Sequence, residues 1–145
     1  MEIFVNGKSA GKAQVKDYFA KIPCIYEPGE LVGVGYDADG QEIYRTSVRT
    51  ADAETVLTVK TDKNILRAGG QDFCFADVYV TDKNGTVKLL PDYDVKIEVV
   101  GAASLQGYGS AAYKNAEHYD QHHHKSWQGH LQAVLRSTEK TGPVT

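Results

Sequence analysis

The histidines of this chain are gathered in one short segment. All five fall between residues 118 and 130, as His118, His122, His123, His124 and His130. Imidazole is a good ligand for Zn²⁺ or Ni²⁺, and His122 with His124 on a strand, or His118 with His122 on a helix, could share one ion. However, no H-E-x-x-H spacing and no cysteine supports the cluster, and a structural site normally fixes four ligands. We therefore interpret the segment as a solvated polar loop and predict no metal site, with His122 and His124 the one pair that could serve as ligands.

The same segment carries aromatic rings among amide groups. The rings are Tyr108, Tyr113, Tyr119 and Trp127, and the amides include Asn115, Gln121 and Gln128. Sugar-binding surfaces use such sets, because rings take the apolar face of a sugar and polar groups take its hydroxyls. The alternative is that Trp127 and one tyrosine close the end of a β-sandwich, where these residues are often partly buried. The second interpretation is favoured, and exposed, coplanar rings would favour the first.

Alternation of apolar and polar residues with a period of two predicts strands along most of the chain. The segment Phe73–Val80 places Cys74, Ala76, Val78 and Val80 on one face, and the segment Tyr93–Val100 turns Val95, Ile97 and Val99 inward. Tyr18–Tyr26 also has the composition of a strand. Asn6-Gly7 predicts a hairpin turn between the first two strands. No convincing amphipathic helix is found.

Short strands separated by Gly, Asn and Asp turns predict an all-β protein built as an Ig-like β-sandwich. A small, polar stretch at residues 50–54 places a domain boundary near residue 52. This gives one partial Ig-like module at 1–52, followed by one complete module at 53–145. Because the first segment supplies about four strands and an Ig-like sandwich takes about seven, we expect its unpaired edges to pack on the second module or to self-associate.

Composition excludes several function classes. With 145 residues and a formal net charge of −3, the chain has no basic field for nucleic acid. No apolar run approaches the roughly 20 residues of a membrane span, and the start does not read as a signal peptide. The chain is also too short for a (β/α)₈ barrel, which takes about 250 residues. Cys24 and Cys74 are expected to be free, buried and structural, and no cofactor is predicted.

Two sets of motifs resemble known modules. Asn6-Gly7-Lys8-Ser9, Gly11-Lys12, Tyr26-Glu27-Pro28-Gly29-Glu30-Leu31 and Gly35-Tyr36-Asp37 resemble the Ig-like domain that follows the barrel in bacterial β-galactosidases of glycoside hydrolase family 2. The second set resembles the C-terminal, invasin-like Ig module of the longer enzymes: Leu57, Asp62, Ala68-Gly69-Gly70-Gln71-Asp72, Val78, Val80, Asp82, Gly85, Gly107, Gly109, Gly129, Ala133 and Arg136-Ser137.

The resemblance implies an accessory role. In that family the catalytic glutamates lie in a barrel upstream of these modules, and no position here matches either motif, so no catalytic residue is assigned. The implied role is to support or position the barrel of a parent β-galactosidase, with its catalytic domains as partners. A carbohydrate-binding module using Tyr108–Trp127 and a structural Ig repeat of a surface protein are the alternatives. A bacterial location would be periplasmic or extracellular for an exported parent, and cytoplasmic otherwise.

Overall fold

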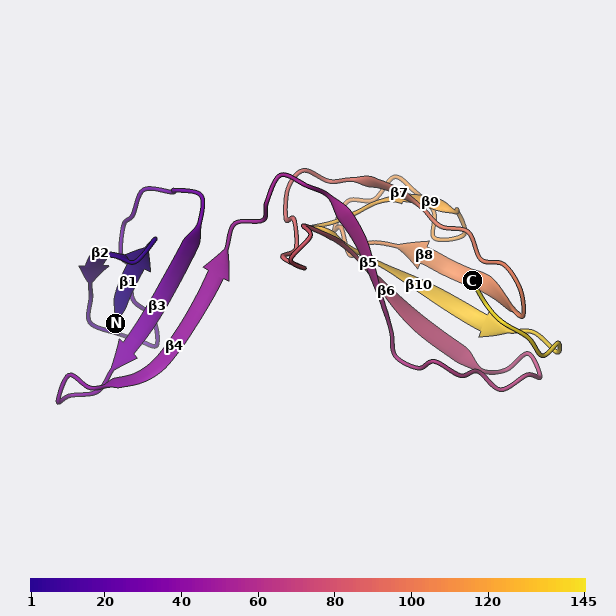
Figure 1. The fold of residues 1–145 in the computed structure, drawn as a ribbon, viewed down its shortest axis with the longest axis horizontal. Helices are drawn as coiled ribbons and strands as arrows, with labels where there is room; N and C mark the ends of the chain where they lie inside the picture. Colours follow the sequence, from indigo (N-terminus) through magenta and orange to yellow (C-terminus); the bar gives the residue numbers. More distant parts are fainter. The chain divides into compact units, whose positions relative to one another are not determined.

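The computed structural model describes all residues, 1–145, and every regular element in it is a strand (Figure 1). The strands are β1 (Glu2–Val5), β2 (Lys8–Lys12), β3 (Glu30–Tyr36), β4 (Glu42–Arg49), β5 (Val56–Thr61), β6 (Phe73–Thr81), β7 (Asp94–Lys96), β8 (Ala103–Gly109), β9 (His123–Lys125) and β10 (His130–Ser137). The predicted all-β class is confirmed. The structure contains no helix of the length and apolarity needed to cross a membrane.

Contacts divide the chain into two compact units, Met1–Thr50 and Ala51–Thr145. The first unit is one antiparallel sheet in the order β2-β1-β3-β4. Asn6 and Gly7 link β1 to β2 with φ angles of 48° and 77°, the left-handed conformation that a two-residue type I′ hairpin requires. The central strand β3 buries Val32 and Val34, whereas the edge strand β4 is exposed along its whole length.

A buried carboxylate joins three strands of this first unit. Glu2 of β1 accepts hydrogen bonds from the hydroxyls of Ser9 at 2.6 Å and Tyr36 at 2.9 Å, and Lys12 lies 3.3 Å away. The Ser9 hydrogen bond is the largest of the contacts that lower the pKa of Glu2. The carboxylate is therefore held ionised as a structural group.

The strand predicted for Tyr18–Tyr26 is wrong. No regular strand lies between Lys12 and Glu30, and only an isolated bridge between Lys16 and Phe19 occurs there. Asp17 and Tyr18 have φ angles of 51° and 69°, which interrupt the extended backbone that a strand needs. Cys24 is consequently exposed, which corrects the prediction of a buried thiol, whereas Cys74 is free and buried as expected.

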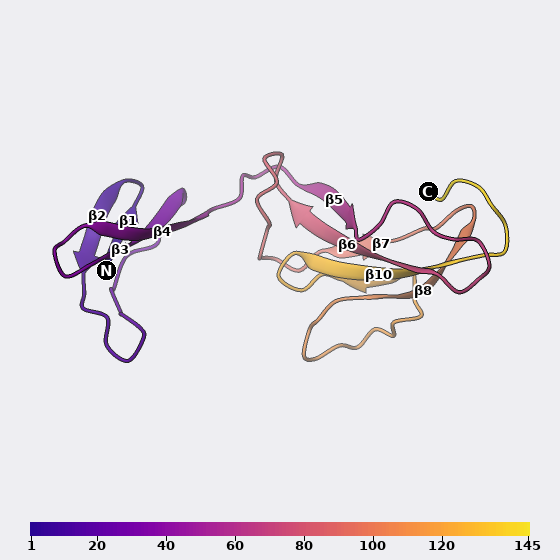
Figure 2. The ribbon, with the colours of Figure 1, turned by 90° about the horizontal axis from the view of Figure 1, so that it is seen from below.

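The second unit has two layers. One is an antiparallel sheet in the order β5-β6-β10-β8, and the other is the short pair β7-β9. The core between them is formed by Ala76, Val78, Val80, Val95, Tyr108, Leu131 and Ala133. The predicted inward face of β6 is confirmed, and Val95 is buried while Ile97 and Val99 are half-buried. The connection between β8 and β9 leaves the four-stranded sheet on the side away from the C-terminal segment (Figure 2).

Candidate functional site

Tyr108, the first ring of the aromatic segment, belongs to the core. Its side chain is 1% exposed, and its hydroxyl donates a hydrogen bond to the Val95 carbonyl oxygen at 3.3 Å. Burial raises the pKa of Tyr108 to about 12, because the phenolate would lose its hydration. Tyr108 thus fixes the β8 strand to β7 and presents no ring face to solvent.

The other three rings lie in two separate places, two of them paired with each other and the third stacked on a histidine. Trp127 is half-buried and meets the exposed Tyr113 edge to face, with 5.7 Å between the ring centroids and 81° between the planes. Tyr119 instead stacks on His124, with 5.8 Å between the centroids and 11° between the planes. The four rings therefore do not make one continuous flat platform.

The histidines are also dispersed. His124 is fully buried, with its Nδ1 atom 3.2 Å from the Lys125 carbonyl oxygen and its Nε2 atom 3.4 Å from the Asn115 amide nitrogen. His122 is exposed, and His130 stacks on Tyr79. In residues 1–145, no group of three or more His, Cys, Asp or Glu side chains is placed to share a metal ion.

Three carboxylates of the second unit have lowered pKa values. For each one the largest cause is a hydrogen bond accepted from a backbone N–H, given by Phe75 to Asp62, by Arg67 to Asp72 and by Asp52 to Asp82. A glycosidase general acid requires the opposite shift, because it must hold its proton near neutral pH. These carboxylates are therefore structural groups that hold loops and strand ends.

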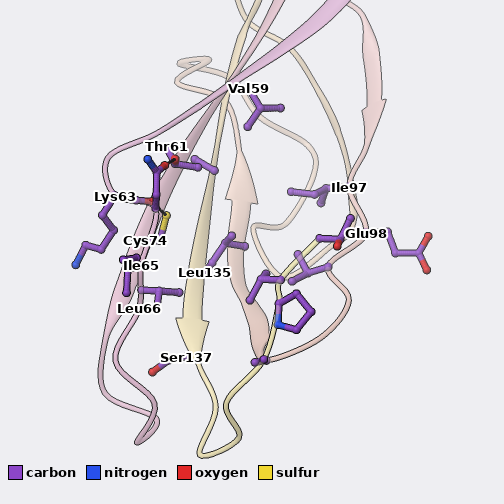
Figure 3. Close-up of a pocket in the computed structure, with 18 of the residues that line it drawn as sticks. Val59, Thr61, Lys63, Ile65, Leu66, Cys74, Ile97, Glu98, Leu135 and Ser137 are labelled. Atoms are coloured by element: carbon purple, nitrogen blue, oxygen red, sulfur yellow. Dashed lines mark hydrogen bonds between the residues drawn. The ribbon is translucent and has the colours of Figure 1, made fainter.

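The second unit has an apolar groove with a volume of about 830 Å³. Ile65 and Leu66 lie on one side, Ile97 lies on the other, and Val59 lies between them at the top of the view (Figure 3). Leu135 of β10 lies between these two sides in the same view. This groove is the core side of the sheet, left open because the short β7-β9 layer does not extend over β5.

The walls of the groove are unusually exposed for apolar residues. Leu57 and Val59 pair with Val80 and Val78 of β6, so they share the core face of the sheet, yet they are 53% and 59% exposed. Ile65 is 83% exposed. Such a contiguous apolar patch marks a surface for contact with another protein segment. Sequence analysis missed it, because alternation shows which face a residue occupies and not whether another layer covers it.

Comparison with known proteins gives consistent matches over the chain. The family model described as glycoside hydrolase family 2 C-terminal domain 5 matches residues 57–145, and a domain of unknown function (DUF4982) matches residues 1–44. Beta-galactosidase BoGH2A of Bacteroides ovatus is 27% identical over 98% of this chain, which spans 17% of the length of that relative.

Solved structures agree with these matches. A glycosyl hydrolase family 2 member from Bacteroides cellulosilyticus superposes with a TM-score of 0.91 at 25% identity, over 99% of this chain and 19% of that one. A β-glycosidase from Bacteroides vulgatus has the same fold, with a TM-score of 0.82 at 23% identity over 99% of this chain and 18% of that one. Since the matched family model covers more than half of the chain, this protein belongs to glycoside hydrolase family 2, as a C-terminal region of that family.

Proposed function

We propose that this chain is a non-catalytic accessory region of a β-galactosidase that hydrolyses O-glycosyl bonds. The exposed apolar groove along β5 is the observation that carries the proposal. The occupant of the groove is the catalytic part of the same polypeptide. Two facts support this choice: the chain spans only 17% of its β-galactosidase relative, and its shifted carboxylates in the second unit serve as hydrogen-bond acceptors within the fold.

The domain division belongs to the same proposal. Residues 1–52 form a partial Ig-like module, and residues 53–145 form a C-terminal Ig-like module of family 2 glycosidases. The contact division at Thr50 and Ala51 supports it, as do the separate family matches to residues 1–44 and 57–145.

Self-association through the first unit is the second part of the partner proposal. β4 is an edge strand that pairs only with β3, and its Ile43, Tyr44 and Val48 are 67%, 61% and 64% exposed. The unpaired N–H and C=O groups of an edge strand recruit another strand, and charged side chains on the edge oppose such pairing. β4 already carries Glu42, Arg45 and Arg49, so a further charge should weaken pairing through its remaining apolar side chains. Val48→Lys should therefore lower the dimer fraction measured by light scattering. A wild-type chain that is already monomeric would contradict this part of the proposal.

The accessory role is tested in the longer glycosidase polypeptide that the proposal requires. Leu57→Ser in the groove should lower the melting temperature of that enzyme by more than it lowers that of the isolated chain, where the shift should stay within about 2–4 °C because more than half of the side chain is already exposed. The matched control is Phe75→Ser, which removes a similarly exposed apolar residue from the opposite face of the same sheet. Equal effects of Leu57→Ser in both proteins, or a reading frame without a catalytic barrel, would contradict the proposal.

A further inference from the structure

The outward face of the four-stranded sheet in the second unit carries a trough of about 470 Å³. Gly107 and Gly109 of β8 line it together with His130, Gln132 and Val134 of β10. Strand pairing sets Val134 opposite Gly107 and Gln132 opposite Gly109. The side chains of β10 therefore stand beside two positions that have no side chain, and the trough is built into the register of the sheet.

Tyr119 forms one wall of this trough. It is 57% exposed, and a Cβ atom at Gly109 would collide with its ring, so the glycine is what allows the ring to lie against β8. The ring also stacks on the buried His124. An aromatic ring that is held in this way while remaining exposed is a suitable stacking surface for the apolar face of a pyranose.

A polar network lies beside the trough. The Gln132 amide donates a hydrogen bond to Oδ1 of Asp77 at 2.9 Å, and Nε2 of His130 lies 3.2 Å from the same oxygen. The His130 ring is in turn stacked on Tyr79, with 4.7 Å between the centroids. These contacts fix the three side chains and leave Oδ2 of Asp77, Oε1 of Gln132 and Nδ1 of His130 without a partner in the protein. Fixed groups with spare polar atoms bind hydroxyls at a low entropic cost.

We propose that this trough binds a neutral saccharide, with the Tyr119 ring stacking on the sugar and with Gln132 and His130, both held by Asp77, bonding its hydroxyls. Neutral sugar is the class that fits, because a carboxylate at the centre of the network repels anionic sugars. Of the four rings of the aromatic segment, the site uses Tyr119 and leaves out the Tyr113–Trp127 pair. Saccharide binding would be a second function, because the accessory packing role proposed above requires no ligand.

The test is affinity electrophoresis of the full 145-residue chain in gels containing galactan, xyloglucan or, as an anionic probe, polygalacturonate. The chain should be retarded by a neutral polysaccharide. Gln132→Ala and Tyr119→Ala should each weaken the retardation about tenfold, which corresponds to roughly 1.4 kcal/mol. The matched controls are Gln71→Ala and Tyr113→Ala, which remove an exposed glutamine and an exposed tyrosine that do not line the trough. Melting curves verify that each variant is folded.

Three results would overturn the proposal. The first is migration of the wild-type chain at the same rate in all gels and in a gel without polysaccharide. The second is retardation that Tyr113→Ala abolishes and Gln132→Ala does not change, which would assign binding to the Tyr113–Trp127 pair. The third is stronger retardation by polygalacturonate than by the neutral polymers.

Discussion

The carboxylate of Asp82 accepts a hydrogen bond from the backbone N–H of Asp52, 30 residues earlier, at 2.9 Å. Its other oxygen accepts hydrogen bonds from the N–H groups of Asn84 at 2.8 Å and Thr86 at 2.9 Å. One nearly buried side chain thus closes the turn after β6 and fastens the first residues of the second unit to it. The aspartate is a structural clamp.

This clamp predicts a pH dependence of stability. The three backbone hydrogen bonds lower the pKa of Asp82 in the folded state below its ordinary value of 3.8. Because the folded pKa lies below the unfolded pKa, the stabilisation is complete above the unfolded value and is lost as the pH falls through the folded value. Asp82→Asn should therefore melt at a lower temperature than the wild type at pH 7, and the difference should shrink below pH 3.8. Asp92→Asn, at an exposed position, serves as the control. A difference in melting temperature between Asp82→Asn and the wild type that stays constant with pH would contradict this role of Asp82.

Gly85 and Gly129 are both glycines with a positive φ angle, but only Gly129 also lacks room for a Cβ atom. Gly129 and Gly85 have φ angles of 71° and 84°, so alanine is strained at both. A Cβ atom at Gly129 would also collide with the Lys88 carbonyl oxygen and approach Val87 Cγ1 to 2.8 Å, whereas Gly85 has no atom within 4 Å. Gly85→Ala should cost about 1 kcal/mol of unfolding free energy, and Gly129→Ala about 2–5 kcal/mol, in urea titrations. Equal losses of unfolding free energy in the two variants would mean that the loop at Lys88 moves aside to accommodate the added Cβ atom at no cost.

Trp127 is expected to contribute to the stability of the fold and not to the binding of polysaccharide. It is half-buried against Tyr113, so Trp127→Ala should reduce the unfolding free energy by about 1–3 kcal/mol, less than the loss for a fully buried tryptophan. Tyr113→Ala, which truncates an 81% exposed ring, should change stability by less than about 0.5 kcal/mol. An unchanged melting curve for Trp127→Ala, combined with lost retention on polysaccharide, would instead assign this ring to binding.

The second unit should fold alone and the first should not. Ala51–Thr145 has its own two-layer core, whereas Met1–Thr50 has one sheet with a fully exposed edge strand. Thermal scans of the two fragments should show a cooperative transition for 51–145 and a broad or absent one for 1–50. A sharp transition in the shorter fragment would contradict this expectation.

The fold class and the buried face of β6 could be predicted because side chains of a strand alternate between its two faces. Cys74, Ala76, Val78 and Val80 follow that rule, and all four are buried. The trough on the outward face could not be predicted, although Tyr119 in its wall was a candidate from the sequence. The trough depends on which β10 side chains stand opposite Gly107 and Gly109, and such register arises from long-range pairing. The segment Tyr18–Tyr26 has the composition of a strand, but Tyr18 at its start adopts a left-handed conformation and the segment joins no strand of the sheet.

The central claim, that this chain is a non-catalytic part of a glycosidase, is tested most directly by assaying the purified chain for hydrolysis of nitrophenyl β-galactoside at high protein concentration. The predicted result is a rate equal to that of the buffer blank. Hydrolysis that co-purifies with the chain through two columns, and that disappears when one of its own carboxylates is replaced by the corresponding amide, would contradict the claim.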